Sequence, residues 1–378
     1  MKALGIIFSS IHERDIPELT KVRTLASVPF GGRYRLIDFV LSNMVNSGIT
    51  NIGIIAKYNY QSLMDHVQSG KNWGLARKNG GLTILPPFND VSGGGVFNNR
   101  FEAIKSVESF IRHNEADYVV MSDCDIVCNF DFAAAMVYHQ KKGADITMVC
   151  RKKAVEESDK YRMVVETDAD GRVVKASMND DLPGEKMVYT DLMIIDRNLL
   201  MYIIENSTRW GVTSFSRDIL SNTKDYKIYS YEHDGYYAAV NSLIDYYRHS
   251  MELLDPNVVR ELFYKGGAEI YTKVRDSAPA KFTDTAQVTD SMIADGCIIE
   301  GEVENSIIFR NCHIAKGAKI SNSIIMQDSR VESGSTLNCV IMDKDAHVLE
   351  GRLLSGHPTH PYYLSLIHIS EPTRLDVI

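Results

Sequence analysis

The chain has 378 residues, of which 44% are hydrophobic and 24% charged, a composition typical of a folded protein with a sizeable core. Lysine and arginine number 41 against 49 aspartates and glutamates, which gives a net charge of −8 at pH 7. This balance argues against a basic face for nucleic acid or for an anionic membrane surface, so any anionic ligand must be held locally. The length predicts two domains.

The six cysteines show no paired spacing of the zinc or redox type, and the sequence shows no signal peptide and no long apolar segment. A reduced, cytoplasmic setting is therefore expected. Cys124 and Cys128 have the spacing of half a metal site, but no second pair accompanies them. We interpret them as two buried thiols, and no metal site is expected.

Apolar runs alternate with segments of helical spacing in the first part of the chain. The runs that are typical of buried parallel strands cover residues 2–9, 52–56, 118–122 and 146–150. The segments with the spacing of amphipathic helices cover residues 39–46, 61–67, 101–114 and 132–142. This alternation predicts an α/β domain with a doubly wound, mixed and mostly parallel sheet of the Rossmann-like kind.

Helical periodicity appears for the last time in residues 242–254. We expect Asp255-Pro256 to end it, because proline lacks the amide donor and clashes with the preceding turn. The first domain is therefore predicted to cover residues 1–255. A connector is predicted over residues 256–285, with an irregular end at 277–280.

The C-terminal part repeats with a period of about 17 residues. Glycines recur at Gly301, Gly317, Gly334 and Gly351. The tetrapeptide Asn-Ser-Ile-Ile occurs twice with nearly the same step, and the variant Asn-Cys-Val-Ile follows. The pattern predicts a left-handed parallel β-helix of hexapeptide-type repeats over residues 286–364, with glycine at corners that need a positive φ and roughly four coils between residues 288 and 350.

The last residues, 365–378, fit neither domain. They resemble the translated read-through of a sequencing adaptor, so we interpret them as a non-native tail and leave them out of the reasoning on fold and function.

The segment from Val28 to Asn43, VPFGGRYRLIDFVLSN, carries the most specific motif of the chain. Supporting matches are YQSL at residues 60–63, FSRDI at 215–219 and GYY at 235–237. With these motifs, residues 1–364 resemble the bacterial glucose-1-phosphate adenylyltransferase (ADP-glucose pyrophosphorylase) family. The resemblance implies a nucleotidyltransferase-like first domain and adenylyl transfer from ATP to glucose 1-phosphate, which yields ADP-glucose and pyrophosphate in bacterial glycogen biosynthesis.

The same resemblance implies that four charged positions of the family's active site are lost. The two aspartates that hold Mg²⁺ are replaced by Cys124 and Ala239, and two lysines are replaced by Leu25 and Asn179. The phosphate-binding loop, residues 9–14, lacks glycine, and Arg100 and Phe101 add bulk where the family has small residues. Each lost electrostatic group typically costs about 10² to 10³ in rate, so we expect no catalytic residues in this chain and no bound cofactor.

Three residues are candidate substitutes for the lost charges: Arg14, Asp123 and Asp125. The two aspartates flank Cys124 and should point to the opposite face of an extended strand. An alternative interpretation is therefore an active sugar-phosphate nucleotidyltransferase that uses these groups together with Lys57, and Mg²⁺ would be needed only in that case.

Arg23 and Arg35 match family arginines that face an anionic activator, and Arg33 shares the face of Arg35 if the segment is extended. Asp218 is a candidate sugar-phosphate contact by the same resemblance. The implied role is that of a regulatory GlgD-type subunit in a mixed tetramer with a catalytic glucose-1-phosphate adenylyltransferase subunit. A remote alternative is a β-helix acyltransferase with His313 as general base. The sequence leaves the activator, substrate binding, subunit stoichiometry and true C-terminus open.

Overall fold

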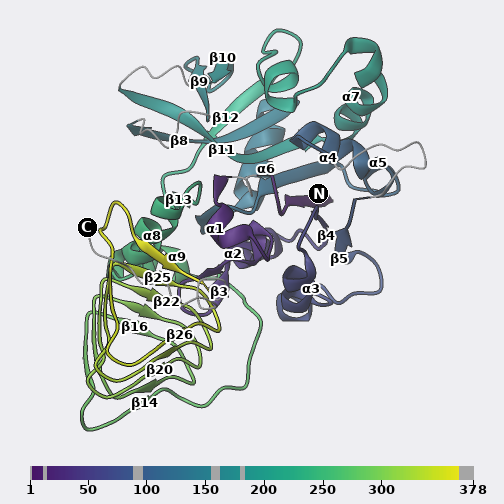
Figure 1. The fold of residues 1–378 in the computed structure, drawn as a ribbon. Coiled ribbons are helices and arrows are strands. Elements are labelled where there is room, and N and C mark those ends of the chain that lie inside the picture. Colours follow the sequence, from purple (N-terminus) through teal and green to yellow (C-terminus); the bar gives the residue numbers. More distant parts are fainter. Residues whose placement is uncertain (1, 12–14, 88–96, 155–161, 179–183, 366–378) are drawn as a thin grey trace.

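The computed structural model describes residues 2–11, 15–87, 97–154, 162–178 and 184–365. An α/β domain comes first, and a three-sided β-helix is attached to one end of it (Figure 1). The predicted fold class is confirmed. Arg14, Asn179 and most of the tail, for which the sequence makes predictions, lie outside the described residues.

The α/β domain is built on a nine-stranded mixed sheet in which β10, β9, β11, β6, β1, β4 and β5 follow one another, and β8 pairs with β11 and β12. Its strands are β1 Ala3–Phe8, β4 Asn51–Ile55, β5 Gly81–Leu85, β6 Tyr118–Asp123, β8 Ile146–Ala154, β9 Met163–Thr167, β10 Val173–Met178, β11 Glu185–Asp196 and β12 Ile228–Glu232. The centre is parallel, since β1 pairs in parallel with both β4 and β6. Strand β11 runs antiparallel to β6 and β8, which makes the sheet mixed.

Helices cover both faces of this sheet. They are α1 Pro17–Thr20, α2 Leu36–Asn46, α3 Gln61–Val67, α4 Arg100–Ser106, α5 Glu108–Arg112, α6 Phe132–Lys142, α7 Arg197–Trp210, α8 Leu243–Glu252 and α9 Pro256–Phe263. Alternate side chains of β1 serve the two faces: Leu4 and Ile6 join one hydrophobic cluster, whereas Ile7 joins the other. Short ladders complete the domain: β2 Pro29–Phe30 with β3 Tyr34–Arg35, and β7 Ile126–Cys128 with β13 Tyr237–Ala239.

Two predictions on helices are corrected. The segment 101–114 forms two helices, α4 and α5, which are separated at Val107. Helix α8 ends at Glu252, before Asp255-Pro256 as expected, but it is not the last helix: α9 begins at Pro256, with the Asp255 side chain as its cap. Among the described residues, no helix has both the length and the apolar character needed to cross a bilayer.

The β-helix has three parallel sheets of five strands each. The strands are β14 Lys281–Phe282, β15 Gln287–Thr289, β16 Met292–Ile293, β17 Ile298–Ile299, β18 Glu302–Glu304, β19 Ile307–Ile308, β20 His313–Ile314, β21 Lys319–Ser321, β22 Ile324–Ile325, β23 Arg330–Val331, β24 Thr336–Asn338, β25 Val340–Met342, β26 His347–Val348, β27 Leu353–Ser355 and β28 Tyr362–Leu364. The stack is therefore longer than the predicted four coils, because its first and last strands lack the glycine and Asn-Ser-Ile-Ile signals of the middle coils.

The corners of the β-helix use glycine for two different reasons. The last three glycines of the repeat have a positive φ, as expected. Gly301 does not, and it is needed because an added Cβ would lie 2.4 Å from the carbonyl oxygen of Ala318. Asn305 and Asn322 also have a positive φ, so the asparagine of the repeated tetrapeptide forms a second kind of corner.

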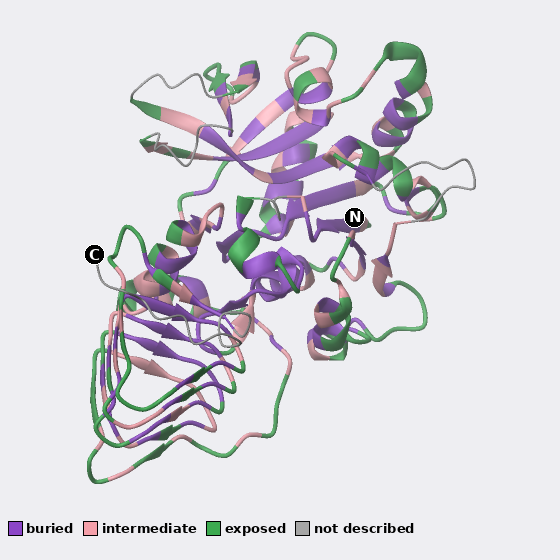
Figure 2. Cartoon of the chain, viewed as in Figure 1, coloured by how far each residue is buried: buried purple, intermediate pink, exposed green. Residues whose placement is uncertain are grey.

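The two domains share one hydrophobic cluster, which contains Phe30 of the first domain and Phe309 and Ile324 of the β-helix. Hydrogen bonds reinforce this junction, because the hydroxyl of Tyr247 on α8 donates to the carbonyl oxygen of Asn322 at 2.6 Å. The inner faces of the coils and the centre of the sheet are buried, whereas the far ends of β8 and β10 are exposed (Figure 2). The β-helix is thus packed against the α/β domain as part of the same core.

Candidate functional site

A large cleft lies at the carboxyl ends of the central strands, where ligands bind in open α/β sheets. Its volume is about 850 Å³. It is lined by Ile11, Asp15, Asn98, Asn99, Arg100, Arg162, Met163, Met178, Tyr189, Asp191, Ser214, Phe215, Ser216, Asn241, Ser242, Ile244, Asp245 and Arg248. The cleft therefore has the place and size of a substrate site, and its chemistry depends on its charged floor.

Arg100 occupies one side of this floor. Its Nη2 donates to the carboxylate of Asp123 at the end of β6 and to that of Asp191 on β11, the latter at 2.9 Å. Burial lowers the pKa of Arg100, but the charges of Asp123 and Asp191 outweigh this effect and raise that pKa well above its ordinary value. The guanidinium group is thus held as a permanent cation between two carboxylates.

Arg162 extends the same network. Its Nη1 donates to Asp191 at 2.8 Å, and its Nη2 lies 3.5 Å from Asp125 and donates to the amide oxygen of Asn241 at 3.0 Å. The side chains of Arg162 and Asp125 are 9% and 0% exposed, so this pairing takes place out of water. Three carboxylates and two guanidinium groups therefore form one ion-pair network at the cleft floor, with one carboxylate in excess.

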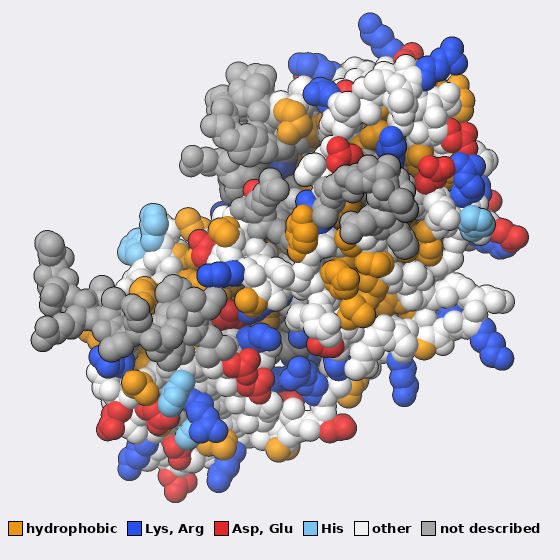
Figure 3. Space-filling view, turned by 45° about the vertical axis from the view of Figure 1, so that its right-hand side comes forward, with side chains coloured by type: hydrophobic (Ala, Val, Ile, Leu, Met, Phe, Trp, Pro, Cys, Tyr) orange, Lys and Arg blue, Asp and Glu red, His pale blue; other side chains and the backbone are white. Residues whose placement is uncertain are grey.

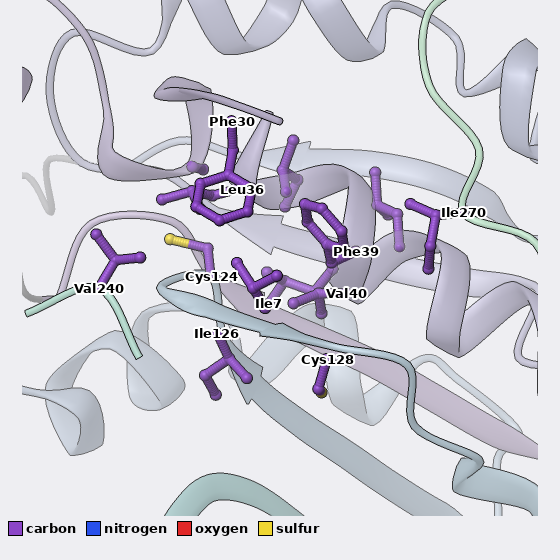
Figure 4. Packing of buried hydrophobic residues seen from close by; sticks show 14 of the residues in the cluster. Ile7, Phe30, Leu36, Phe39, Val40, Cys124, Ile126, Cys128, Val240 and Ile270 are labelled. Atoms are coloured by element: carbon purple, nitrogen blue, oxygen red, sulfur yellow. The ribbon is translucent and has the colours of Figure 1, made fainter. Parts of the chain in front are cut away.

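Cys124 points away from that network into the hydrophobic core (Figure 4). Its side chain is 2% exposed and belongs to the cluster that contains Phe30, Leu36 and Val240. The flanking Asp123 and Asp125 face the arginines, although only Asp123 belongs to β6 and the chain bends at residues 124 and 125 before β7. The thiols of Cys124 and Cys128 are buried, as interpreted from their spacing.

Ala239 lies on β13, where it pairs with Ile126 of β7. The amide of Val240 donates to the carbonyl oxygen of Asp125 at 2.9 Å, which fixes this segment beside the end of β6. The two positions that the family resemblance assigns to Mg²⁺ therefore belong to neighbouring segments, but they supply a thiol and a methyl group. Neither is an oxygen ligand of the kind that Mg²⁺ requires.

The remaining acids do not fit a Mg²⁺ site as they stand. Asp123 and Asp191 are engaged by Arg100, and Asp125 is engaged by Arg162. Across the described ranges, no group of three histidine, cysteine, aspartate or glutamate side chains is placed to hold a metal ion. A divalent cation would have to displace two guanidinium groups from this floor.

Other residues that the sequence singled out have separate partners. Leu25 is buried in the core. The ammonium group of Lys57 lies over the rings of Tyr58 and Phe97 at 5.3 and 5.4 Å. His313 pairs with Glu300 on the β-helix at 3.2 Å, outside the residues that line the cleft.

Asp218 lies inside the π-helical segment Phe215–Leu220, whose N-cap is Ser214. Its Oδ2 accepts hydrogen bonds from the amides of Thr213 and Ser214, both at 2.8 Å, and Arg217 Nε donates to its Oδ1. The bond from Arg217 and the two amides hold the pKa of Asp218 below its usual range. The carboxylate is thus used within its own turn, and it does not line the cleft.

The three arginines predicted to bind an anionic effector lie at two different places in the structure. Arg23 is 2% exposed, and its Nη2 donates to both carboxylate oxygens of Asp343 on the β-helix at 2.7 Å. Arg33 and Arg35 line a different hollow between the domains. This hollow, named here the junction pocket, is also lined by Lys273 and Arg275 of the connector and by Arg310 of the β-helix.

Basic side chains gather around the junction pocket, which itself measures only about 30 Å³, and one of them, Arg310, pairs with Asp295 at 2.9 Å. Burial lowers the pKa of Arg35 to about 10, and the charge of Arg275 lowers it further although Asp38 opposes the change. Burial also lowers the pKa of Lys273, again with help from Arg275 and Arg35. An adjoining hollow of about 470 Å³ shares Arg33, Arg275 and Arg310 with the pocket.

On the face shown in Figure 3, acidic and basic side chains are interspersed. The cationic groups that matter for an anion are therefore gathered locally, as the net charge of the chain suggested.

Sequence reasoning missed Arg162, Asp191, Lys273, Arg275 and Arg310. Each lies outside the recognised motifs and reaches its site only through the tertiary fold. Arg100 was recognised only as added bulk. Its charge was a usable signal, because an arginine that becomes buried is almost always paired with an acidic side chain.

Comparison with known proteins finds a match to the nucleotidyl transferase family over residues 16–254 and one to the GlmU-like C-terminal hexapeptide family over residues 278–358. The chain is 33% identical over 323 residues to the glycogen biosynthesis protein GlgD of Bacillus subtilis, an alignment that covers 84% of this chain and 82% of that protein. It is 38% identical over 347 residues to GlgD of Geobacillus stearothermophilus, with 84% and 83% covered. It is 32% identical over 311 residues to the glucose-1-phosphate adenylyltransferase of Thermosipho melanesiensis, with 80% and 74% covered.

Proposed function

Because this chain belongs to the nucleotidyl transferase family, in the group of GlgD and glucose-1-phosphate adenylyltransferase proteins, we propose that it is a non-catalytic, regulatory subunit in glycogen biosynthesis. Its partner would be a catalytic glucose-1-phosphate adenylyltransferase chain in the cytoplasm, and the two would form a mixed tetramer. The role in glycogen biosynthesis rests on the named relatives, whereas the non-catalytic and regulatory parts rest on the site.

One observation carries the non-catalytic part. The floor of the cleft is a network of ion pairs, in which Arg100 and Arg162 hold the acids that a divalent cation would need. Transfer of a nucleotidyl group requires preorganised positive charge around the phosphates, and these guanidinium groups are already engaged. Such a floor favours a stable fold over catalysis.

The regulatory part rests on the junction pocket. Its cations come from three parts of the chain: Arg33 from the first domain, Arg275 from the connector and Arg310 from the β-helix. The basic side chains of the pocket repel one another, and a bound anion would reduce this repulsion. Guanidinium groups also bind phosphate well. An anionic effector would thus tie the two domains together and shift the partner's equilibrium between states of low and high activity through differential contacts.

Arg23 takes a structural part in this proposal. Arg23 forms a buried ion pair with Asp343, which links the β-helix to the first domain. Its charge is therefore not presented to an effector. The effector site is therefore assigned to the junction pocket, which keeps Arg33 and Arg35 and adds three cations.

The direct test measures pyrophosphate release from ATP and glucose 1-phosphate in the presence of Mg²⁺. The purified chain alone is expected to give only the background rate. Addition of the catalytic chain from the same genome should restore release and change its dependence on effector concentration. Substantial turnover by the isolated chain would overturn the proposal, and so would a catalytic partner whose kinetics stay the same in its presence.

The effector site is tested in the mixed complex with Arg275→Met, which removes one charge and keeps an aliphatic side chain. The effector concentration for half-maximal response should rise about tenfold or more. The exposed Arg352 on the β-helix gives the control variant Arg352→Met, which should leave the response unchanged. If the unchanged complex, Arg275→Met and Arg352→Met all needed the same effector concentration, the effector would not bind in the junction pocket.

A further inference from the structure

Two cysteines are stacked on adjacent coils of the β-helix. Strand β17 pairs in register with β20, with Ile298 opposite His313. Cys297 and Cys312 immediately precede these two residues, so they occupy equivalent positions of the two coils. Neighbouring strands lie about 4.8 Å apart, which is within the Cα separation of about 4.4–6.8 Å that a disulfide bridges. The backbone therefore places the two cysteines within range of a disulfide bond.

Both cysteine side chains are directed into the interior of the β-helix. Each is 1% exposed, and both belong to the apolar cluster that fills the coils. The Cys297 thiol donates to the carbonyl oxygen of Phe309 at 2.9 Å. The Cys312 thiol lies 3.2 Å from the carbonyl oxygen of Met326 and is also a hydrogen-bond partner of Cys297. The two sulfur atoms thus share one buried corner.

The two thiols differ in acidity. The hydrogen bond with Cys312 lowers the pKa of Cys297 below its ordinary value, and backbone amides at Asn311 and Cys312 add to this effect although burial opposes it. Burial raises the pKa of Cys312 well above its ordinary value, and its contact with Cys297 raises that pKa further. Because the thiolate is the reactive form of cysteine, Cys297 is the better nucleophile of the two.

The fold itself does not require sulfur at this corner. Arg330 and His347 continue the register of His313 on the next two coils. The residues before them are Ser329 and Ala346, which are buried in the same way. A small side chain is therefore sufficient to fill the corner, and the paired thiols add a reactivity that packing does not need.

The pair lies one coil from the open end of the β-helix. The amide of Lys281 on β14 donates to the carbonyl oxygen of Cys297 at 2.8 Å, so the first coil covers the pair. Strand β14 is the terminal strand of its sheet, and Phe282 on it is 51% exposed. Local opening is easiest where few apolar contacts hold an element, so transient release of β14 gives a small oxidant a route to Cys297.

We propose that Cys297 and Cys312 form a reversible oxidation site, at which a peroxide converts the two thiols into a disulfide bond between adjacent coils. The bond fastens the corner beside the ion pair of Asp295 and Arg310. The inference does not depend on the proposed subunit role, because it concerns only the chemistry of these two thiols.

The reaction proceeds in two balanced steps. The Cys297 thiolate attacks one oxygen of hydrogen peroxide, the O–O bond breaks, and the released hydroxide takes up the proton that the thiol has lost, which leaves a sulfenic acid and one water molecule. The Cys312 sulfur then attacks the sulfenic sulfur, the S–S bond forms, and the S–O bond breaks as the oxygen leaves with the Cys312 proton as a second water molecule. The protein loses two electrons, and one peroxide is reduced to two water molecules.

Peptide mass spectrometry of the purified full chain tests this inference. The reduced chain is treated with hydrogen peroxide, its remaining thiols are blocked with N-ethylmaleimide, and it is digested with trypsin, which cleaves after Arg310 and so separates the two cysteines. A disulfide-linked peptide pair that contains Cys297 and Cys312 should appear, and dithiothreitol should remove it. The oxidised chain should also have a higher urea midpoint than the reduced chain, because the bond restricts the unfolded chain.

Three variants assign the roles of the two thiols. Cys312→Ala should leave a sulfenic acid on Cys297 that dimedone labels, whereas Cys297→Ser should give far less label on Cys312. Neither variant should show the shift in the urea midpoint. Cys339→Ser replaces another buried thiol of the β-helix and is the matched control, which should form the bond as the unchanged chain does.

Folding of the variants is checked by circular dichroism, and Cys297→Ala replaces Cys297→Ser if the latter does not fold. Absence of the linked peptide from the peroxide-treated native chain would overturn the inference, and so would a bond that forms only in urea. Dimedone label on Cys312 equal to that on Cys297 would contradict the assignment of the nucleophile. Equal linkage of other cysteine pairs would show unspecific oxidation and would also overturn the proposal.

Discussion

The ion pair between Arg23 and Asp343 gives a sharp prediction about how the two domains are held together. The side chains are 3% and 9% exposed, and the carboxylate also accepts a hydrogen bond from the Tyr363 hydroxyl at 2.8 Å. Asp343→Ala would leave the guanidinium of Arg23 buried without its counter-charge. Removing one partner of such a pair typically costs about 3–5 kcal/mol, because the remaining charge stays desolvated.

The expected loss can be separated from a general effect of mutation. Replacing both partners by apolar side chains, Arg23→Met with Asp343→Leu, leaves no buried charge and should cost less than about half of the single change. The exposed pair of Lys319 and Glu302 provides a control, since Lys319→Met should cost less than about 1 kcal/mol.

Urea unfolding at pH 7, followed by circular dichroism, measures these free energies. The free energy of unfolding should fall most in Asp343→Ala, less in the double variant and least in Lys319→Met. If Asp343→Ala were no more destabilising than Lys319→Met, the pair would not fasten the domains, and Arg23 would return as a candidate for effector binding.

Three further predictions concern stability. Burial lowers the pKa of His66, His139 and His233, so these side chains resist protonation in the folded chain. Their contribution to stability is complete above about pH 6.5 and is lost as the pH falls toward their folded pKa values. The urea midpoint at pH 5 should therefore lie below that at pH 7.5, and the difference should be smaller in His139→Gln. Cys124→Asp should cost about 3 kcal/mol or more in urea unfolding, because it places a carboxylate in an apolar cluster, whereas Cys124→Ala should cost less. Gly301→Ala should lower stability by about 1–3 kcal/mol, because the added Cβ would press against the Ala318 carbonyl oxygen. Gly266→Ala should be neutral, because an added Cβ there meets nothing within 4 Å. Similar urea midpoints for the two variants would contradict the packing argument.

The sequence predicted the repetitive part of the fold well, because each coil of the β-helix repeats the same local requirements. Its start was harder to place than its end at residue 364, since the first coil begins at Lys281, before the predicted residue 286, and lacks the repeated signals. The start of α9 shows a different difficulty. Asp255-Pro256 is compatible with both an end and a beginning of a helix, and only packing decides between them.

The site was predictable where it depends on strand alternation. The opposite orientations of Cys124 and its flanking aspartates were expected from strand alternation, and they are found although Cys124 and Asp125 lie in the bend between β6 and β7. The partners of those aspartates were not predictable, because Arg162 is 37 residues from Asp125 in the sequence and meets it only in the folded chain. The same holds for the junction pocket, whose cations are contributed by both domains and the connector.

The central claim is that the cleft floor is closed to catalysis by its own ion pairs. Pyrophosphate release by the isolated chain, measured with ATP, glucose 1-phosphate and Mg²⁺ and compared with the same assay after addition of the catalytic subunit, tests it most directly. The account predicts a background rate for the chain alone and an altered effector response for the mixture. A robust rate from the chain alone, lost on Asp123→Asn or Asp125→Asn, would show that these acids bind the cation after all and would contradict the account.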